Sequence, residues 1–328
     1  MNKFLMIVTL AVVAAAFQWQ NASAAILSPS CTQMKAPFIG TLCTPADGKR
    51  HPAMILLGGS EGGNSMAQTA KVFAQHGYVT ASVAYFGLPG LPKYLVNIPV
   101  ETVGHAIAAL QSRKDVIASK IGIMGGSKGG EFALLAASTY RQLHAVVAFV
   151  PSPVAFMGLG QYSMPTDCSW SKSGKSLPCV AASPRGNAAI GKAFYSGKPV
   201  ALKPLYDDSL NANADAVKAA FFPLQNIAAP VLCLAAVDDQ MWDSPRQCTM
   251  TMDYLHAHHH PYADRMIAYP NAGHIFLFSP WMPTGKLLVA PIPGTPGLAF
   301  GGTVAGDLTA SKRAWSTIWH YLATTLRT

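Results

Sequence analysis

The chain has 328 residues, of which half are hydrophobic and 12% are charged, and this composition excludes a disordered protein. Its formal net charge is +9 at pH 7, but the basic residues form neither a long run nor a motif interleaved with aromatic residues, so we expect no nucleic-acid partner. The length fits one large α/β domain or two smaller ones.

The first 24 residues have the pattern of an export signal. Lys3 precedes an apolar run over 4–16, and Ala-Ser-Ala at 22–24 supplies small residues for cleavage. A membrane anchor is the alternative, but the run is shorter than the ~20 apolar residues that span a bilayer, and no later segment is long enough. We therefore predict a removable signal peptide over 1–24, a single domain over 25–328, and a periplasmic or secreted protein without stable membrane insertion.

All six cysteines follow the predicted cleavage point, where export would place them in an oxidising compartment. Six cysteines allow about 15 connectivities. Their positions form three local couples, each closing a loop worth roughly 3 kcal/mol in the chain-entropy description. The predicted pairs are Cys31–Cys43, Cys168–Cys179 and Cys233–Cys248. Free buried thiols are the alternative, which best suits Cys233 in its apolar strand. The chain has no Cys-x-x-Cys, so we expect no metal at the cysteines.

From residue 52 onward, short apolar runs alternate with helical patterns. This alternation is typical of a mostly parallel sheet flanked by crossover helices. The predicted strands are 53–57, 78–85, 120–124, 145–150, 231–236 and 265–269. The predicted helices are about 66–76, 100–112, 128–138, 244–256 and 308–326.

Residues 151–229 interrupt this alternation with prolines, glycines, two cysteines and weak periodicity. A compact sheet needs only a short crossover here, and long ordered loops are usually functional. We predict a lid insertion over the catalytic edge, the alternative being a disulfide-pinned surface excursion without a role. A second stretch rich in Pro and Gly, over 279–306, precedes the final helix.

The principal catalytic signal is Gly-Gly-Ser-Lys-Gly at 125–129, which fits G-x-S-x-G between a predicted strand and a predicted helix. Glycines at such a turn relieve crowding and push the serine hydroxyl out of the sheet. The pentapeptide alone also fits an ordinary helix start, but its context favours a nucleophile. We predict that Ser127 is the nucleophile of a serine hydrolase.

A serine hydroxyl needs a base to take its proton and an acid to hold that base in the right tautomer. In folds that carry this motif, the acid and then the histidine follow the serine along the chain. Asp238 and Asp239 come directly after the predicted strand 231–236, and His274 follows the strand 265–269. We predict that Asp239 is the acid, with Asp238 as the competing choice, and that His274 is the base.

The other nine histidines have ordinary explanations. The cluster His-Ala-His-His-His at 256–260 ends a predicted helix and lacks a carboxylate at ligand spacing, so we expect no metal there. The remaining ones precede predicted strands or lie on helical patterns, which favours structural roles; they are His51, His76, His105, His144 and His320.

The charge that develops on an attacked carbonyl oxygen needs backbone donors, one of them the N–H after the nucleophile. Lys128 supplies it. The second donor is predicted in Gly-Gly-Ser-Glu-Gly-Gly at 58–63, directly after the strand 53–57, with Ser60 as the first choice and Glu61 as the next. A phosphate-binding loop is the alternative, but the glycine spacing fits neither common motif.

Six motifs follow one another along the chain: LLGGSEGG, VFAQHGYVTASVAYFG, IGIMGGSKGGEFALLAAS, PVLCLAAVDDQMWDS, YPNAGH and GGTVAGDLTASKRAWSTIWHYL. In this order they resemble the catalytic α/β-hydrolase domain of the bile acid-CoA:amino acid N-acyltransferase and acyl-CoA thioesterase family, from about residue 52 to the C-terminus. The resemblance implies that fold and a triad of Ser127, Asp239 and His274. Acyltransferase members of the family have cysteine where this chain has Ser127, so the resemblance implies hydrolysis. Family members typically place an immunoglobulin-like sandwich before this domain, and 25–51 is too short to form one.

Together these observations predict an exported serine hydrolase that cleaves small-molecule carboxylic esters or thioesters through an acyl-enzyme, with no cofactor. One alternative is an acyltransferase that passes the acyl group to an amine or alcohol. The other is a non-catalytic binding protein on the same fold, since one fold hosts many functions.

Overall fold

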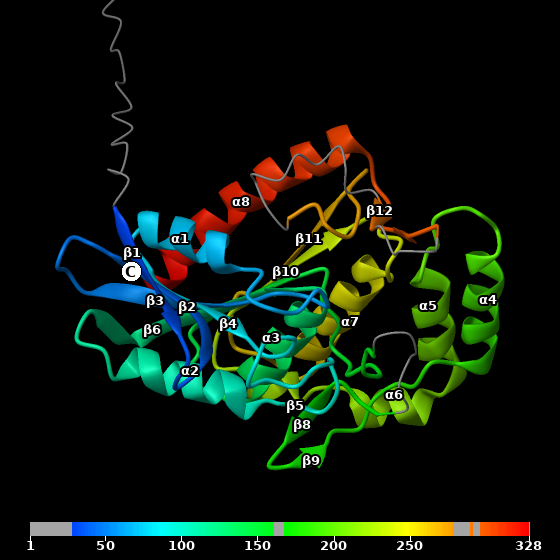
Figure 1. Cartoon of the computed structure of the whole chain (residues 1–328), viewed down its shortest axis with the longest axis horizontal. Coiled ribbons are helices and arrows are strands. Elements are labelled where there is room, and N and C mark those ends of the chain that lie inside the picture. The colour runs from blue at the N-terminus through cyan, green and yellow to red at the C-terminus, as the bar shows by residue number, and fades with distance from the viewer. Residues whose placement is uncertain (1–27, 161–166, 278–288, 291–295, 328) are drawn as a thin grey trace, which may run out of the picture.

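The computed structural model describes residues 28–160, 167–277, 289–290 and 296–327, so the predicted signal peptide lies outside it. Its centre is an eight-stranded sheet in the order β1-β2-β4-β3-β6-β7-β10-β11 (Figure 1). All neighbours from β4 to β11 are parallel. The parallel strands are β3 (His51–Leu57), β4 (Val79–Ala84), β6 (Val116–Gly126), β7 (Ala145–Phe149), β10 (Val231–Ala236) and β11 (Arg265–Tyr269).

Helices cover both faces of this sheet, as Figure 1 shows. On one face α1 (Ala67–Gln75) and α8 (Val304–Leu326) share a hydrophobic cluster with the strands. On the other face lie α2 (Glu101–Gln111), α3 (Lys128–Thr139) and the end of α7 (Ser244–Ala257). Because helices cover both faces, β3 and β10 are buried along their whole length. Strands buried in this way read as nearly continuous apolar runs in the sequence. Every predicted strand and helix is present, and the mostly parallel sheet is confirmed.

One edge of the sheet was missed by the sequence prediction. β1 (Pro29–Met34) and β2 (Ile39–Pro45) form an antiparallel hairpin, with Cys31 opposite Cys43, and β2 pairs antiparallel with β4. The β1 side chains are mostly polar and exposed, so their sequence carries no alternation of apolar residues.

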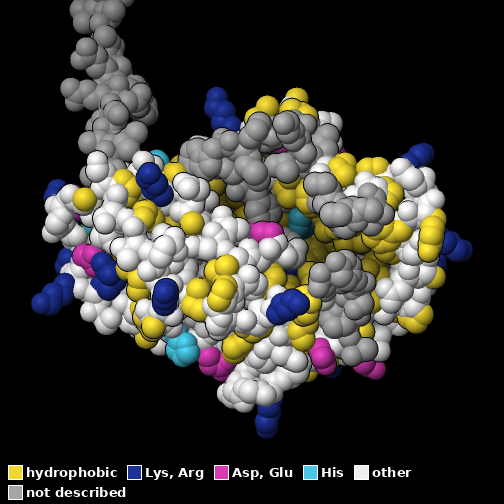
Figure 2. All heavy atoms as spheres, in the orientation of Figure 1, with side chains coloured by type: hydrophobic (Ala, Val, Ile, Leu, Met, Phe, Trp, Pro, Cys, Tyr) yellow, Lys and Arg dark blue, Asp and Glu magenta, His cyan; other side chains and the backbone are white. Residues whose placement is uncertain are grey.

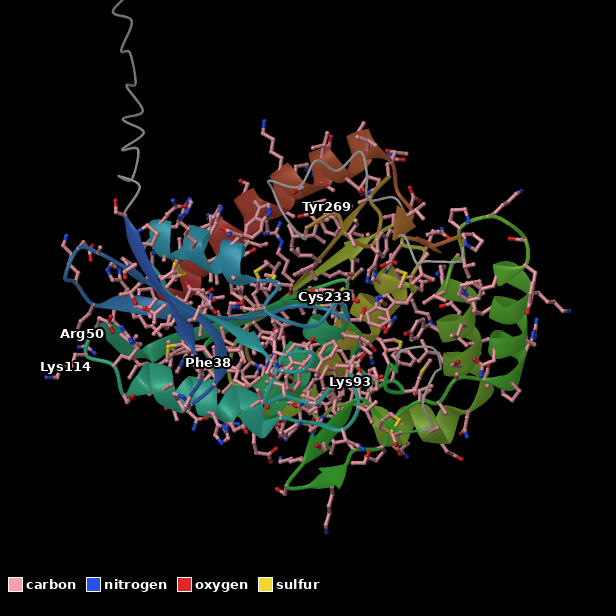
Figure 3. The ribbon with its side chains drawn as sticks, viewed as in Figure 1. Phe38, Arg50, Lys93, Lys114, Cys233 and Tyr269 are labelled. Carbon is pink, nitrogen blue, oxygen red and sulfur yellow. A yellow bond between two sulfur atoms is a disulfide. The ribbon has the colours of Figure 1, made fainter. Side chains whose placement is uncertain are left out.

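The six cysteines form the three predicted disulfides. Cys233 lies inside the sheet on β10 (Figure 3) and is bonded to Cys248 on α7. The alternative of a free thiol at Cys233 is therefore wrong. An apolar strand suits a free cysteine, but α7 packs on β10 at bonding distance, a long-range contact that sequence alone does not give.

Residues 151–229, called the insertion below, form more regular structure than their weak periodicity predicted. The described part contains β8 (Trp170–Lys172), β9 (Lys175–Ser176), α4 (Pro184–Phe194), α5 (Lys203–Ala212), α6 (Ala214–Ala220) and a 3-10 turn, η1 (Leu224–Asn226). β8 pairs with β5 (Ile98–Pro99). α4 and α6 bury only one residue each, Gly186 and Ala220, which leaves a weak burial signal, whereas α5 buries four residues and was missed all the same.

The last irregular stretch contains β12 (Val289–Ala290) and β13 (Leu298–Ala299), which pair antiparallel. Within the described ranges, no helix has the length and hydropathy needed to cross a bilayer.

Candidate active site

The three residues predicted to form a triad meet at the carboxyl edge of the parallel strands. Ser127 directly follows β6, Asp239 lies in the loop after β10, and His274 in the loop after β11. The opposite, amino edge of the sheet is marked by Arg50 and Lys114, which precede β3 and β6. Figure 3 shows these two residues together at the far end of the molecule from α4 and α5. Open α/β sheets assemble their sites at the carboxyl edge, which is where these three candidate residues lie.

Two short contacts join these side chains. Ser127 Oγ lies 2.8 Å from His274 Nε2, and His274 Nδ1 lies 2.9 and 3.0 Å from the two carboxylate oxygens of Asp239. A proton on Nδ1 satisfies the carboxylate and leaves Nε2 to accept from the serine hydroxyl. Asp239 and His274 are almost fully buried, and Ser127 is 7% exposed. The arrangement can transfer a proton from the hydroxyl to the imidazole.

Asp239, and not its neighbour Asp238, faces the imidazole. Its Oδ1 also accepts the backbone N–H groups of Met241 at 2.9 Å and Trp242 at 3.2 Å. These donors fix the carboxylate in a turn after β10. Asp238 instead donates its backbone N–H to the carbonyl of Ala272.

Ser127 has backbone dihedrals that only a constrained turn imposes. Its φ of 55° and ψ of −124° lie outside the regions that non-glycine residues usually adopt. The turn packs so tightly that a Cβ at Gly125 would lie 2.1 Å from the carbonyl oxygen of Gly129. A Cβ at Gly129 would lie 2.0 Å from the carbonyl oxygen of Gly58. The glycines of the motif are thus sterically required, and they bring the loop after β3 against the serine turn.

The predicted oxyanion donors lie on these two segments. Lys128 is the first residue of α3, so its N–H has no carbonyl partner within the helix. In the loop after β3, the N–H of Gly59 already donates to Glu61 Oε1 at 2.9 Å. For the N–H of Ser60, no acceptor lies among the described residues, and Ser60 is exposed.

A buried ion pair lies beneath the serine turn and was missed by sequence reasoning. Lys128 Nζ donates to both oxygens of Glu131, at 3.0 and 3.1 Å, and both side chains are nearly inaccessible to solvent. Glu131 Oε1 also accepts the N–H of Phe156 at 3.0 Å and the indole N–H of Trp170 at 2.6 Å. A glutamate inside the otherwise apolar α3 pattern was the available signal.

Burial acts on both ends of this pair. Desolvation lowers the pKa of Lys128 and raises the pKa of Glu131, and the attraction between the two opposes each change. Because Phe156 and Trp170 belong to the insertion, the carboxylate ties the insertion to the helix that begins at the serine turn.

Trp242 is a second residue that sequence reasoning missed. Its ring meets the His274 ring edge to face, with centroids 5.6 Å apart, and its indole N–H donates to the carbonyl of Val150 at 3.0 Å. Trp242 also belongs to the hydrophobic cluster of the insertion. Its position directly after the acid loop gave no signal by itself.

The histidine cluster takes no part in this site. His260 contacts Asp264 Oδ2 at 2.6 Å and the carbonyl of Ile227 at 2.9 Å, bonds that fix the end of α7. Within the described ranges, no group of three or more His, Cys, Asp or Glu side chains is placed to hold a metal ion.

The strand order, the crossover helices and the serine turn after β6 define an α/β-hydrolase fold. The α/β hydrolase GrgF from Penicillium sp. sh18 is similar in structure, with a TM-score of 0.51 and 16% identity over 92% of this chain and all of that one. The profile of the family "BAAT / Acyl-CoA thioester hydrolase C terminal" matches residues 98–328, and the chain belongs to this family.

Two curated relatives are similar over most of this chain. Acyl-coenzyme A thioesterase 1 of Homo sapiens is 26% identical over 277 residues, which cover 84% of this chain and 60% of the relative. Acyl-coenzyme A amino acid N-acyltransferase 1 of Mus musculus is 24% identical over 279 residues, which cover 85% of this chain and 61% of the relative. The alignment thus spans about three fifths of the length of these relatives.

Proposed function

We propose that the protein is an exported serine hydrolase that cleaves carboxylic esters or thioesters through an acyl-enzyme. One observation carries the proposal: Ser127 Oγ, the His274 imidazole and the Asp239 carboxylate form a chain of contacts of 3.0 Å or less at the carboxyl edge of the sheet. Family membership and the likeness to an acyl-CoA thioesterase support the class of substrate.

The geometry gives each residue a role. His274 Nε2 takes the hydroxyl proton while Ser127 Oγ attacks the carbonyl carbon, and Asp239 stabilises the imidazolium that forms. The N–H groups of Lys128 and Ser60 receive the oxyanion. The imidazolium then protonates the leaving alcohol or thiol, and a water activated by His274 releases the acid and restores Ser127. This sequence of steps uses no cofactor.

The surroundings of the site suit an apolar acyl group. Figure 2 shows hydrophobic side chains gathered in a hollow between the sheet and the α4–α5 pair. Residues of the insertion, including Phe156 and Tyr206, form a buried cluster with Trp242, and Trp242 contacts His274. We infer that the insertion acts as a lid whose apolar inner surface receives the acyl chain.

Transfer to an amine or alcohol is the second candidate, favoured by the likeness to the murine N-acyltransferase. It shares the acyl-enzyme and differs only in the acceptor. Product analysis with water and added amines or alcohols in competition separates the two candidates. Free acid as the main product at physiological acceptor concentrations supports hydrolysis.

Labelling with a fluorophosphonate tests the proposal directly. Folded wild type should gain one adduct on the peptide that contains Ser127, and Ser127→Ala should lose both the adduct and the esterase activity. Ser119→Ala, at an exposed position on the same strand, serves as the matched control and should behave as wild type. Absence of labelling in folded wild type would refute the proposal.

Export has a separate test. The three disulfides suit an oxidising compartment. The mature protein should begin at Ala25, as read by N-terminal sequencing of exported material. A mature chain that retains Met1 and is found in the cytoplasm contradicts export while leaving the hydrolase proposal intact.

A further inference from the structure

Residues 297–303, called the strap below, contain β13 and lead into α8, and they lie between the two loops that carry Asp239 and His274. The carbonyl oxygen of Phe300 accepts two backbone N–H groups, from His274 at 2.9 Å and from Gln240 at 3.3 Å. One carbonyl therefore fixes the histidine and the residue next to the acid relative to each other. Asp239 and Gly301 also form an isolated β-bridge.

The strap approaches both loops so closely that two of its positions admit only glycine. A Cβ at Gly301 would lie 1.8 Å from the carbonyl oxygen of Asp238, and one at Gly302 would lie 2.3 Å from the nitrogen of Gly273. Both glycines have φ near +75°, at 79° and 72°. Gly301 thus presses on the acid loop and Gly302 on the histidine loop.

The strap is also joined to the insertion. Val200 donates its N–H to the carbonyl of Gly297 and accepts the N–H of Ala299, both at 2.9 Å. The carbonyl of Gln240 accepts the N–H of Lys203, the first residue of α5, at 2.9 Å. Backbone hydrogen bonds thus run without interruption from the insertion through the strap to His274.

We propose that the strap is a positioning element that sets the distance between Asp239 and His274 and couples it to the placement of the insertion. The proposal rests on the proposed function, because it assigns the strap a part in the same acid–base pair. It makes the segment around Val200 a determinant of turnover although no side chain there reaches the reacting atoms. When the insertion is seated, the strap holds the imidazole against the carboxylate; when Val200 separates from 297–299, the pair loosens.

Two substitutions press on the loops from opposite sides. Gly301→Ala displaces the acid loop and Gly302→Ala displaces the histidine loop, so each should lower kcat roughly 100-fold, the effect of about 1 Å of misplacement at a reacting group. KM should change little, because both substitutions act on the acid and histidine loops and not on the insertion. Gly48→Ala is the matched control: its φ is +70°, but nothing lies within 4 Å of an added Cβ, and it sits at the opposite edge of the sheet.

The Nδ1 proton of His274 reports the geometry independently of turnover. In wild type its resonance should be shifted strongly downfield by the Asp239 carboxylate. The shift should shrink in folded Gly301→Ala and Gly302→Ala and persist in Gly48→Ala. If both strap variants keep the resonance and the kcat of Gly48→Ala, the proposal is wrong.

Val200→Pro tests the coupling, because it removes the N–H that donates to Gly297 without substituting any residue of the strap or of the two loops. It should lower kcat roughly 2- to 30-fold, the range found for residues that modulate coupling between sites. A kcat equal to that of wild type overturns the coupling part of the proposal.

A measurement on wild type covers the case in which the glycine variants do not fold. If the strap is one cooperative unit, the amides of Val200, Ala299, Gln240 and His274 should exchange with deuterium at one common opening free energy. Unrelated exchange rates contradict the proposal. Wild type is first labelled with the fluorophosphonate: absence of labelling contradicts the proposed function, whereas labelled wild type together with strap variants that keep the kcat of Gly48→Ala contradicts only the strap proposal.

Discussion

In the central sheet, β3, β4, β7 and β10 are buried along their whole length, and helices pack on both faces. In the insertion, α4 and α6 bury one residue each, although Trp170 and the end of the segment, from Phe222 to Ala229, pack into the main core. Polar contacts also join the insertion to the rest, among them the Glu131 hydrogen bonds to Phe156 and Trp170, the β5–β8 pairing and the Val200 contacts with the strap.

This difference in burial suggests different roles for the two regions. The sheet holds the candidate triad on short loops from strands that cannot shift without opening the core, which suits groups that must stay within tenths of an ångström. In the insertion, α4 and α6 bury one residue each, so this part opens at lower cost, which suits a segment that admits substrate. We therefore expect substitutions at the sheet edge to change chemistry, and substitutions at the junctions to change stability or substrate entry.

The largest expected effect is on turnover at the sheet edge. Asp239→Asn should lower kcat about 10⁴-fold, because an amide in place of the carboxylate favours the wrong imidazole tautomer. Asp238→Asn is the adjacent control and should retain most activity, since the Asp238 contact to Ala272 uses the backbone. Steady-state ester hydrolysis measures both. Equal losses in the two variants would show that the acid has been assigned to the wrong residue.

The next effect concerns the ion pair that joins α3 to the insertion. Glu131→Gln keeps an acceptor for Phe156 and Trp170 but leaves the Lys128 ammonium buried without its partner, so it should lower the free energy of unfolding by about 3–5 kcal/mol. Lys128→Met/Glu131→Gln should recover much of this loss, since no charge then remains buried and the backbone N–H of residue 128 is kept. Urea denaturation at pH 7 measures both.

The sign of the pH dependence adds a second check on the same variant. Burial already lowers the pKa of Lys128, and removing the Glu131 charge lowers it further. The unfolded chain then binds more protons than the folded one, so the stability of Glu131→Gln should rise as the pH rises from 7 toward the ordinary lysine pKa of 10.5. A stability deficit that stays constant over this range would point to lost packing rather than to the unpaired charge.

The two disulfides outside the edge hairpin should behave differently although they close loops of similar length, with sequence separations of 15 and 11. Cys233→Ala/Cys248→Ala should lower global stability by about 3 kcal/mol, because β10 lies inside the sheet. Cys168→Ala/Cys179→Ala should mainly increase protease cleavage within the insertion, with a smaller change in the main thermal transition. Calorimetry and mapped limited proteolysis distinguish them. Similar global losses would mean that the insertion unfolds together with the sheet.

The contrast between the buried sheet and the insertion also explains which parts of the structure the sequence could predict. Strands covered on both faces leave continuous apolar runs, so β3, β6 and β10 were predictable, and with them the loops that carry Ser127, Asp239 and His274. The glycines around Ser127 marked the turn because a Cβ at Gly125 or Gly129 would lie 2.1 Å or less from a neighbouring carbonyl oxygen. These signals are local in sequence.

The insertion and the supports of the site depend on contacts between distant residues. Glu131 meets Trp170, and Phe300 meets both His274 and Gln240, but no local pattern connects these positions. The edge strand β1 is polar and exposed, so it carries no apolar alternation. The groups that could perform chemistry were therefore predictable, whereas the groups that hold them in place were not.

The smallest expected effect concerns Asp307, which lies in the first turn of α8 and accepts the N–H of Gly273 at 2.7 Å, next to His274. A helix N-terminus favours a carboxylate, and the hydrogen bond from Gly273 lowers the pKa of Asp307. Burial, and then the charge of Asp238, act in the opposite direction and prevail, so the pKa of Asp307 lies above its ordinary 3.8.

A folded-state pKa above the unfolded one means that this carboxyl group favours the folded state least once the pH exceeds the raised value. Asp307→Asn keeps the acceptor for Gly273 without the charge and should therefore raise the free energy of unfolding at pH 7. The gain should disappear below about pH 3.8, where Asp307 is protonated in both states. Thermal unfolding over this pH range measures it, and a loss of stability at neutral pH would show that the buried carboxylate supports the histidine loop through its charge.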